Sequence, residues 1–288
     1  AKKIFRIALG IEYEGTAYKG FQKQKSTKKT VQGLLDSALS KVANQQILTA
    51  CSGRTDAGVH AYCQTIHFDT TSLREVKSWI NGGNALLPKD IRILWAKRVS
   101  SDFHSRFSAL SRTYRYIIRN SELPSALDRN KKLWVREKLD LRNMRRASSY
   151  LIGEKDFSSF RSSSCQSKSP NRNISSINIK KKGDLLFIDI SANAFLLNMV
   201  RIITGTLLET GLKKITPKRV KEILDAKDRT LAGKTASPKG LYFVGLDIIG
   251  NNLTEINVTS PTCVREISRD SGIDVAGQLI DCLLSKLS

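Results

Sequence analysis

The sequence predicts an α+β fold of two tandem ferredoxin-like halves, each in the order βαββαβ, whose antiparallel sheets meet at a central basic cleft. Three observations predict it. Strand-like and helix-like apolar patterns follow one another in that order twice. The 288 residues suffice for two domains of ordinary size. Lys and Arg number 48 against 26 Asp and Glu, and the net charge of +22 indicates a polyanionic partner. A generally basic proteome would give the same excess.

The first half is predicted over residues 1–105. A half-apolar strand over 4–13 leads through a polar loop to a helix over 31–42, with Thr30 as its N-cap. Strands over 46–52 and 62–68 follow. A capping-box pattern at 72–75 predicts a helix to about residue 80, and a strand covers 91–99.

The second half is predicted over residues 106–250 and repeats this order. A strand over 113–118 precedes a helix over 141–151 that Asp140 caps. Residues 174–181 and 185–191 form a hairpin. A long apolar helix over 194–211 comes next, then a shorter one that starts at Thr216 and Pro217, and a strand over 241–249.

The remaining residues, 251–288, form a C-terminal tail. It holds five acidic and three basic side chains, so the positive excess belongs to the first 250 residues. Apolar residues over 275–287 recur at helical spacing and predict one amphipathic helix.

Composition also indicates the compartment and the cofactors. No apolar run approaches the roughly 20 residues that span a bilayer, so no membrane segment is expected. The five cysteines form no CxxC pair, which favours reduced thiols of an intracellular, cytoplasmic protein. The three histidines lack helical pairing. We therefore expect no metal site.

Functional groups are concentrated in the loop over residues 53–60, which contains Arg54, Thr55, Asp56 and His60 between two glycines. Loops held by strands often carry chemistry. Asp56 therefore has two interpretations. It is either an ordinary turn residue that bonds its own backbone or a catalytic carboxylate.

Arg201 is the only ionisable residue between 194 and 208, in a segment apolar on nearly every side. A buried guanidinium needs an anion or several acceptors. Arg201 pairs either with a structural carboxylate or with a catalytic one. If Arg54 and Arg201 both pair with Asp56, their charges keep that carboxylate ionised, which suits a nucleophile or general base.

Tyr114 lies on a strand with Tyr116, and alternation places both rings on one face. Core packing explains such a tyrosine. At the edge of a basic cleft it would also form a stacking platform for an unpaired base.

Several motifs together resemble the TruA-type tRNA pseudouridine synthases. The motif around Asp56 resembles the active-site motif of that family, and the similarity continues in order from residue 4 to about 249. Phe21 and Ser52 depart from the usual Trp and Ala. The other segments that carry the resemblance are residues 7–13, 102–109, 112–116, 156–160, 192–195, 199–201 and 240–242.

The resemblance implies an isomerase that converts uridine to pseudouridine at positions 38, 39 and 40 of the tRNA anticodon stem-loop. Asp56 would be the catalytic aspartate, Arg54 a residue that flips or orders the base, and Arg201 the ion-pair partner of Asp56. Tyr114 would stack on the target uracil. It also implies a homodimer and a reaction without cofactor.

Two alternatives stay open. One is a pseudouridine synthase of the same fold with another RNA target. The other is a non-catalytic RNA-binding protein, which would need the basic surface but no buried carboxylate paired with an arginine.

Overall fold

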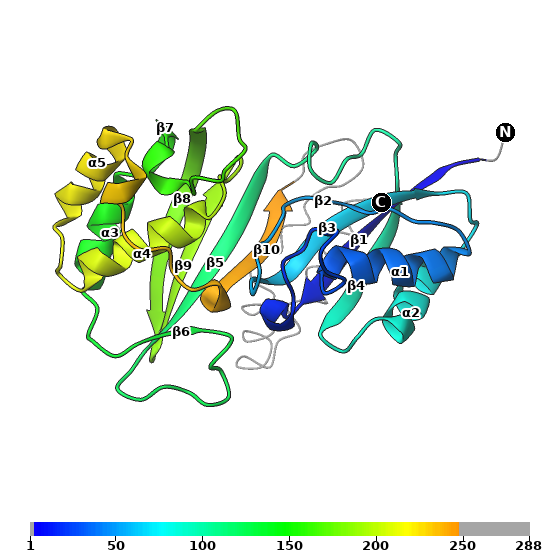
Figure 1. The fold of residues 1–288 in the computed structure, drawn as a ribbon, viewed down its shortest axis with the longest axis horizontal. Coiled ribbons are helices and arrows are strands. Elements are labelled where there is room, and N and C mark those ends of the chain that lie inside the picture. Colours follow the sequence, from blue (N-terminus) through cyan, green and yellow to red (C-terminus); the bar gives the residue numbers. More distant parts are fainter. Residues whose placement is uncertain (1–2, 248–288) are drawn as a thin grey trace, which may run out of the picture. The chain divides into compact units, whose positions relative to one another are not determined.

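The computed structural model describes residues 3–247, with side chains up to residue 245 (Figure 1). The tail predicted over 251–288 and its helix lie outside these residues. Among the described residues, no helix is both long and apolar enough to cross a membrane.

The elements of the first half follow the predicted order. They are β1 (Phe5–Tyr13), α1 (Val31–Ala43), β2 (Ala50–Cys51), β3 (His60–Thr70), α2 (Val76–Leu86) and β4 (Ile91–Val99). Thr30 caps α1 as predicted, because its side chain accepts the N–H of Gly33. Of the strand predicted over 46–52, only β2 pairs in the sheet.

The second half adds two short strands, β6 and β7, to the predicted set. Its elements are β5 (Ser111–Asn120), β6 (Leu133–Val135), α3 (Leu141–Ser149), β7 (Gly153–Asp156), β8 (Asn171–Lys182), β9 (Leu185–Ala192), α4 (Met199–Gly211), α5 (Pro217–Ala226) and β10 (Leu241–Asp247). Asp140 and Thr216 cap α3 and α5 through side-chain oxygens, as the sequence predicted.

One sheet joins the strands of both halves, in the order β4-β1-β3-β10-β5-β9-β8-β7, with β2 and β6 paired beside β3 and β5. The pairing is mostly antiparallel. Strand β10 lies antiparallel to β5 and parallel to β3, and Figure 1 shows it between them. The α+β class is confirmed. The ferredoxin-like assignment of each half and the boundary at residue 105 stay predictions.

Helices cover the two ends of this sheet separately. Helices α1 and α2 pack together beside β1, β3 and β4, whereas α3, α4 and α5 lie over the β8–β9 end (Figure 1). Trp79 of α2 is fully buried and packs edge-on against Phe68 of β3, with 5.1 Å between ring centroids. The middle of the sheet, around β10 and β5, lies between these two groups of helices.

Helix α2 differs from its prediction at both ends. The capping box at 72–75 does not form. The Ser72 N–H donates to the Thr70 hydroxyl, and Glu75 precedes the helix without a side-chain cap. The helix then continues past residue 80 through two glycines. A Cβ on Gly83 would lie 2.3 Å from Ile93, so the glycine permits close packing against β4.

Helix α4 begins at Met199, five residues later than predicted. Asn198 precedes it with a left-handed backbone, φ 61°, which a helix cannot continue through. Residues 194–198 therefore form a loop instead of a helical turn, and this loop reaches the cavity described below.

Candidate active site

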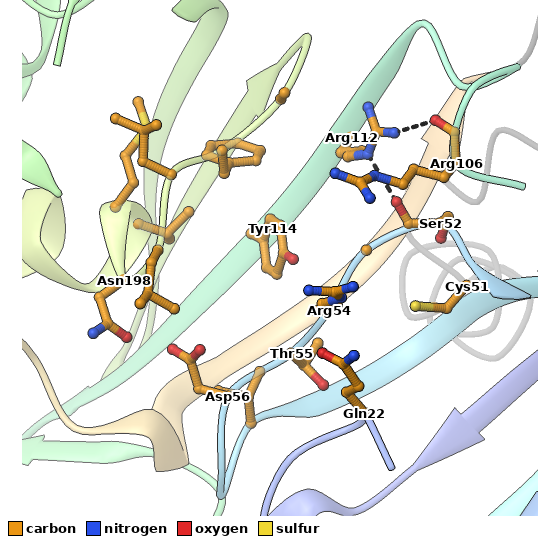
Figure 2. Close-up of a pocket in the computed structure, with 18 of the residues that line it drawn as sticks. Gln22, Cys51, Ser52, Arg54, Thr55, Asp56, Arg106, Arg112, Tyr114 and Asn198 are labelled. Carbon is orange, nitrogen blue, oxygen red and sulfur yellow. Dashed lines mark hydrogen bonds between the residues drawn. The ribbon is translucent and has the colours of Figure 1, made fainter. Parts of the chain in front are cut away.

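A cavity of about 790 Å³ lies between β2 and its following loop, β5, the loop before β5 and the start of α4 (Figure 2). Its size suits a nucleoside-sized ligand. Of the described residues that line it, Asp56 alone is acidic, against five arginines. They are Arg54, Arg106, Arg112, Arg172 and Arg201. The cavity thus combines one carboxylate with a strongly cationic wall.

The loop that carries Asp56 is held on both sides by the first half of the chain. The Thr55 hydroxyl bonds the Tyr13 hydroxyl at 2.7 Å, and the Thr55 carbonyl accepts the Phe21 N–H at 3.1 Å. The backbone then turns, because the Val59 N–H donates to the Asp56 carbonyl and Gly58 adopts φ +78°. These contacts fix Asp56 at the wall of the cavity.

The Asp56 carboxylate accepts a hydrogen bond from Arg201, with 3.1 Å between Oδ2 and Nη1. Within residues 3–245 it accepts none from the backbone of its own loop, which the turn interpretation required. The two side chains are 27% and 15% exposed, so water screens the pair only in part. Asp56 therefore faces the cavity as a paired carboxylate.

Three acceptors fix the guanidinium of Arg201. Nε donates to the Ala236 carbonyl at 2.8 Å, and Nη1 donates to Asn198 Oδ1 at 3.1 Å as well as to Asp56. The Ala236 N–H in turn donates to the Arg201 carbonyl. Asn198, the left-handed residue before α4, thus supplies a hydrogen-bond acceptor to Arg201, which in turn holds the Asp56 carboxylate. Sequence reasoning missed Asn198 and Ala236, and a backbone carbonyl leaves no signal in a sequence.

Tyr114 is buried and projects from β5 toward the same cavity (Figure 2). Its ring packs edge-on against both Phe195 and Phe243, with 5.1 Å between centroids in each case. Its hydroxyl oxygen would be 3.4 Å from a Cβ on Gly53. Burial raises the pKa of Tyr114 well above its usual value, and the negative charge of Asp56 adds to the rise. The phenol therefore stays protonated.

Arg54 does not pair with Asp56, contrary to the expectation from sequence. Its side chain is exposed, lines the cavity, and makes no hydrogen bond or ion pair within the part of the chain that the structure describes. Figure 2 shows the Arg54 guanidinium directed away from the Asp56 carboxylate. Arg54 is thus an available cation at the cavity wall.

His60 is a structural residue. Its Nδ1 accepts the Gly15 N–H at 3.0 Å, and its Nε2 lies 3.1 and 3.2 Å from the carbonyls of Asn130 and Lys239. The ring also stacks on Tyr242 with centroids 4.7 Å apart. Burial lowers the pKa of His60, which keeps the imidazole neutral with its proton on Nε2. His60 holds three backbone segments together behind the loop.

Arg112 is another residue whose role only the structure shows. It donates to the carbonyls of Ser52 at 3.0 Å, Asn193 at 2.7 Å and Arg106 at 2.5 Å. These carbonyls belong to three loops around the cavity, two of which Figure 2 shows linked to Arg112 by dashed lines. Arg112 thus ties the cavity wall together from β5.

The arrangement suits chemistry on a flat, neutral ring attached to a phosphodiester chain. A held carboxylate can attack a carbon centre or accept a proton. A phenol ring beside it can stack on a base, and arginines can bind phosphate. Among the described residues, no group of three or more His, Cys, Asp and Glu side chains converges as a metal site would require.

Comparisons with known proteins agree on one family for the chain. A family model described as tRNA pseudouridine synthase matches residues 10–108 and 147–247. The chain is 50% identical over 242 residues to tRNA pseudouridine synthase A of Alcanivorax borkumensis, which covers 84% of this chain and 91% of that protein. The Aliivibrio fischeri protein of the same name is also 50% identical, over 84% of this chain and 92% of its own length.

A solved structure of an H/ACA RNP bound to a substrate RNA containing 2'-deoxyuridine aligns far more weakly. It is 10% identical with a TM-score of 0.35, and the alignment covers 92% of this chain and 56% of that one. The assignment depends on the sequence relatives.

Proposed function

We propose that this chain, a member of the tRNA pseudouridine synthase family, acts at positions 38, 39 and 40 of the anticodon stem-loop. Membership of the family makes the chain an isomerase of uridine in tRNA. The observation that carries the proposal is the pair of Asp56 and Arg201, which places one held carboxylate in an otherwise cationic cavity. An RNA-binding surface alone has no use for such a pair.

The proposed reaction breaks the N1–C1′ bond of the uridine, turns the base, and forms a C5–C1′ bond. The proton at C5 is lost and N1 gains one, so the nucleoside keeps its composition and no electrons are exchanged. Asp56 is the residue that we assign to the reacting nucleoside, either as nucleophile or as general base. Arg201 is a positioning residue that keeps the carboxylate ionised and oriented.

Tyr114 and Arg54 have proposed roles on the substrate side. The Tyr114 ring, clamped between Phe195 and Phe243, offers a fixed surface to the target uracil. Reaching this cavity requires the uridine to leave its stack, because its reacting edge is covered inside a helix. The available guanidinium of Arg54 suits either the flipping of the base or the ordering of the flipped state.

Cytoplasmic location and homodimeric assembly belong to the same proposal. The cysteine pattern of the sequence favours the first, with which the tRNA substrate agrees, and the family resemblance implies the second. A pseudouridine synthase with another RNA target is the main alternative, and the identity of the modified uridines decides between the two.

The direct test is to map pseudouridine in tRNA after treatment with the pure protein. The wild type should modify uridines 38, 39 and 40, whereas Asp56→Asn should form none and still bind tRNA. Asp225→Ala, an exposed acidic residue of α5, serves as the matched control and should behave as the wild type. Turnover of Asp56→Asn near the wild-type rate would refute the catalytic role, and modification at other positions would refute the proposed target.

A further inference from the structure

Phe107 is an aromatic side chain left in solvent at the edge of the active-site cavity. It lies in the loop between β4 and β5, lines the cavity, and is 76% exposed. Burial of a phenylalanine side chain contributes about 1.5–3 kcal/mol, so an exposed ring forgoes that stabilisation. A single exposed apolar residue is unremarkable on a surface, but this one borders a cavity that binds substrate in the proposed function.

Hydrogen bonds anchor the loop that presents Phe107 to neighbouring strands. Ser105 is fully buried, its hydroxyl donates to the Ala50 carbonyl at 2.9 Å, and its N–H donates to His67 Nδ1 at 3.2 Å. His104 and Ser108 close the turn, since each accepts a backbone N–H of the other at 2.9 Å. The backbone next to Phe107 is therefore tied to β2 through Ala50 and to β3 through His67.

The neighbours of the ring suit a nucleobase. The imidazole of His104 lies 4.3 Å from it, centroid to centroid, at a tilt of 32°. Nδ1 of His104 accepts the N–H groups of Arg106 and Phe107, at 3.1 and 3.3 Å. Burial, with the charges of Arg6 and Arg106, also lowers the pKa of His104, so the ring stays neutral. The Arg106 guanidinium lies 5.7 Å from the Phe107 centroid.

Base flipping removes a stacking contact that the Phe107 ring can replace. When a uridine leaves its stack, the neighbouring base loses contact on one face. Asp56 and Phe107 line the same cavity, one from the loop after β2 and the other from the loop after β4. A flipped uridine at Asp56 would leave its neighbour at the edge of the cavity. An aromatic ring there can replace the lost stacking, and a cation beside it can bind the connecting phosphate.

We propose that Phe107 is a stacking platform for the nucleobase next to the target uridine, with Arg106 on the adjoining phosphate and His104 as support. The proposal rests on the proposed function and adds a second nucleotide subsite to it. A protein partner is the competing occupant. The cavity wall favours RNA, because its described lining holds five arginines against one carboxylate and such a surface attracts a phosphate backbone.

The test uses a hairpin with the anticodon stem-loop sequence, in which 2-aminopurine replaces the nucleotide on one side or the other of the target uridine. The Asp56→Asn substitution is present throughout to prevent turnover. When the hairpin is bound to the Asp56→Asn protein, which keeps Phe107, stacking should quench the fluorescence of one of the two 2-aminopurine probes. Phe107→Tyr should keep the quenching. Phe107→Leu should lose it and raise the Kd about tenfold, within the range for loss of one stacked base. Leu110→Ala, exposed in the same loop and outside the cavity wall, should match the parent chain.

Activity and assembly assays separate the possible failures. If the chain with Asp56 forms pseudouridine but Phe107→Leu changes neither the Kd nor the fluorescence, the stacking subsite is refuted and the proposed function stands. If the chain with Asp56 forms no pseudouridine, the proposed function itself fails. If Phe107→Leu changes the sedimentation of the free protein and leaves RNA binding intact, the ring contacts protein and our assignment is wrong.

Discussion

Replacing Arg201 by methionine removes the contact on which the site depends while keeping a long side chain in place. Three acceptors lose their donor, namely the Asp56 carboxylate, the Asn198 amide oxygen and the Ala236 carbonyl. Hydrogen bonds to charged groups contribute about 1.5–3 kcal/mol each. The side chains of the pair keep 15% and 27% exposure, so water replaces part of the loss. We expect the free energy of unfolding to fall by about 2–3 kcal/mol.

Catalysis should suffer more than stability. Without Arg201, the carboxylate loses the partner that orients it, and a misplacement of about 1 Å can reduce a rate about 100-fold. The assay uses tRNA tritiated at C5 of uridine with enzyme in excess, because bonding of C5 to C1′ releases the label to water. The single-turnover rate at saturation should fall about 100-fold with little change in tRNA Kd.

Arg106→Met is the matched control. Arg106 lines the same cavity, but it approaches Phe107 and not Asp56. It should raise the Kd for tRNA and leave the saturating rate near that of the wild type. An Arg201→Met variant with an unchanged saturating rate would refute the reasoning, whatever its stability.

Two further predictions concern stability. His67 is buried, and burial first, then the charges of His104 and Arg6, lowers its pKa to about 4, against a small opposing effect of Asp69. In the unfolded chain the His67 imidazole takes up its proton at about pH 6.5, well above its pKa in the folded protein. The neutral imidazole therefore contributes fully to the free energy of unfolding above about pH 6.5, and this contribution is lost as the pH falls toward 4. Urea titrations should show a loss of about 3 kcal/mol across this range. The same pH slope in His67→Gln would contradict this. The second prediction concerns Gly205, where an added Cβ would lie 1.8 Å from the Lys234 carbonyl oxygen. Gly205→Ala should therefore lower the free energy of unfolding by about 1–3 kcal/mol, measured by thermal unfolding. Gly82→Ala is the control and should lower it less, because its Cβ would meet only the Val42 side chain.

Local patterns predicted most of the elements because they depend on residues that are close in the chain. The caps at Thr30, Asp140 and Thr216 were correct, since a capping side chain bonds a backbone N–H three residues ahead. The same reasoning failed at residues 72–75, where Ser72 instead pairs with Thr70. Local propensity also ended α2 too early, because close packing of Gly83 on β4 extends the helix.

For the candidate site, the sequence by itself determined which chemical groups are present: a loop dense in functional groups, a lone arginine in an apolar segment, and a large positive charge. Only the tertiary structure decided which of them meet. Arg54 is two residues from Asp56 and points away, whereas Arg201 is 145 residues away and forms the ion pair. Periodicity and capping act over a few residues. Pairing at the site depends on the sheet, in which β10 pairs with both β3 and β5, and these contacts connect segments far apart in sequence.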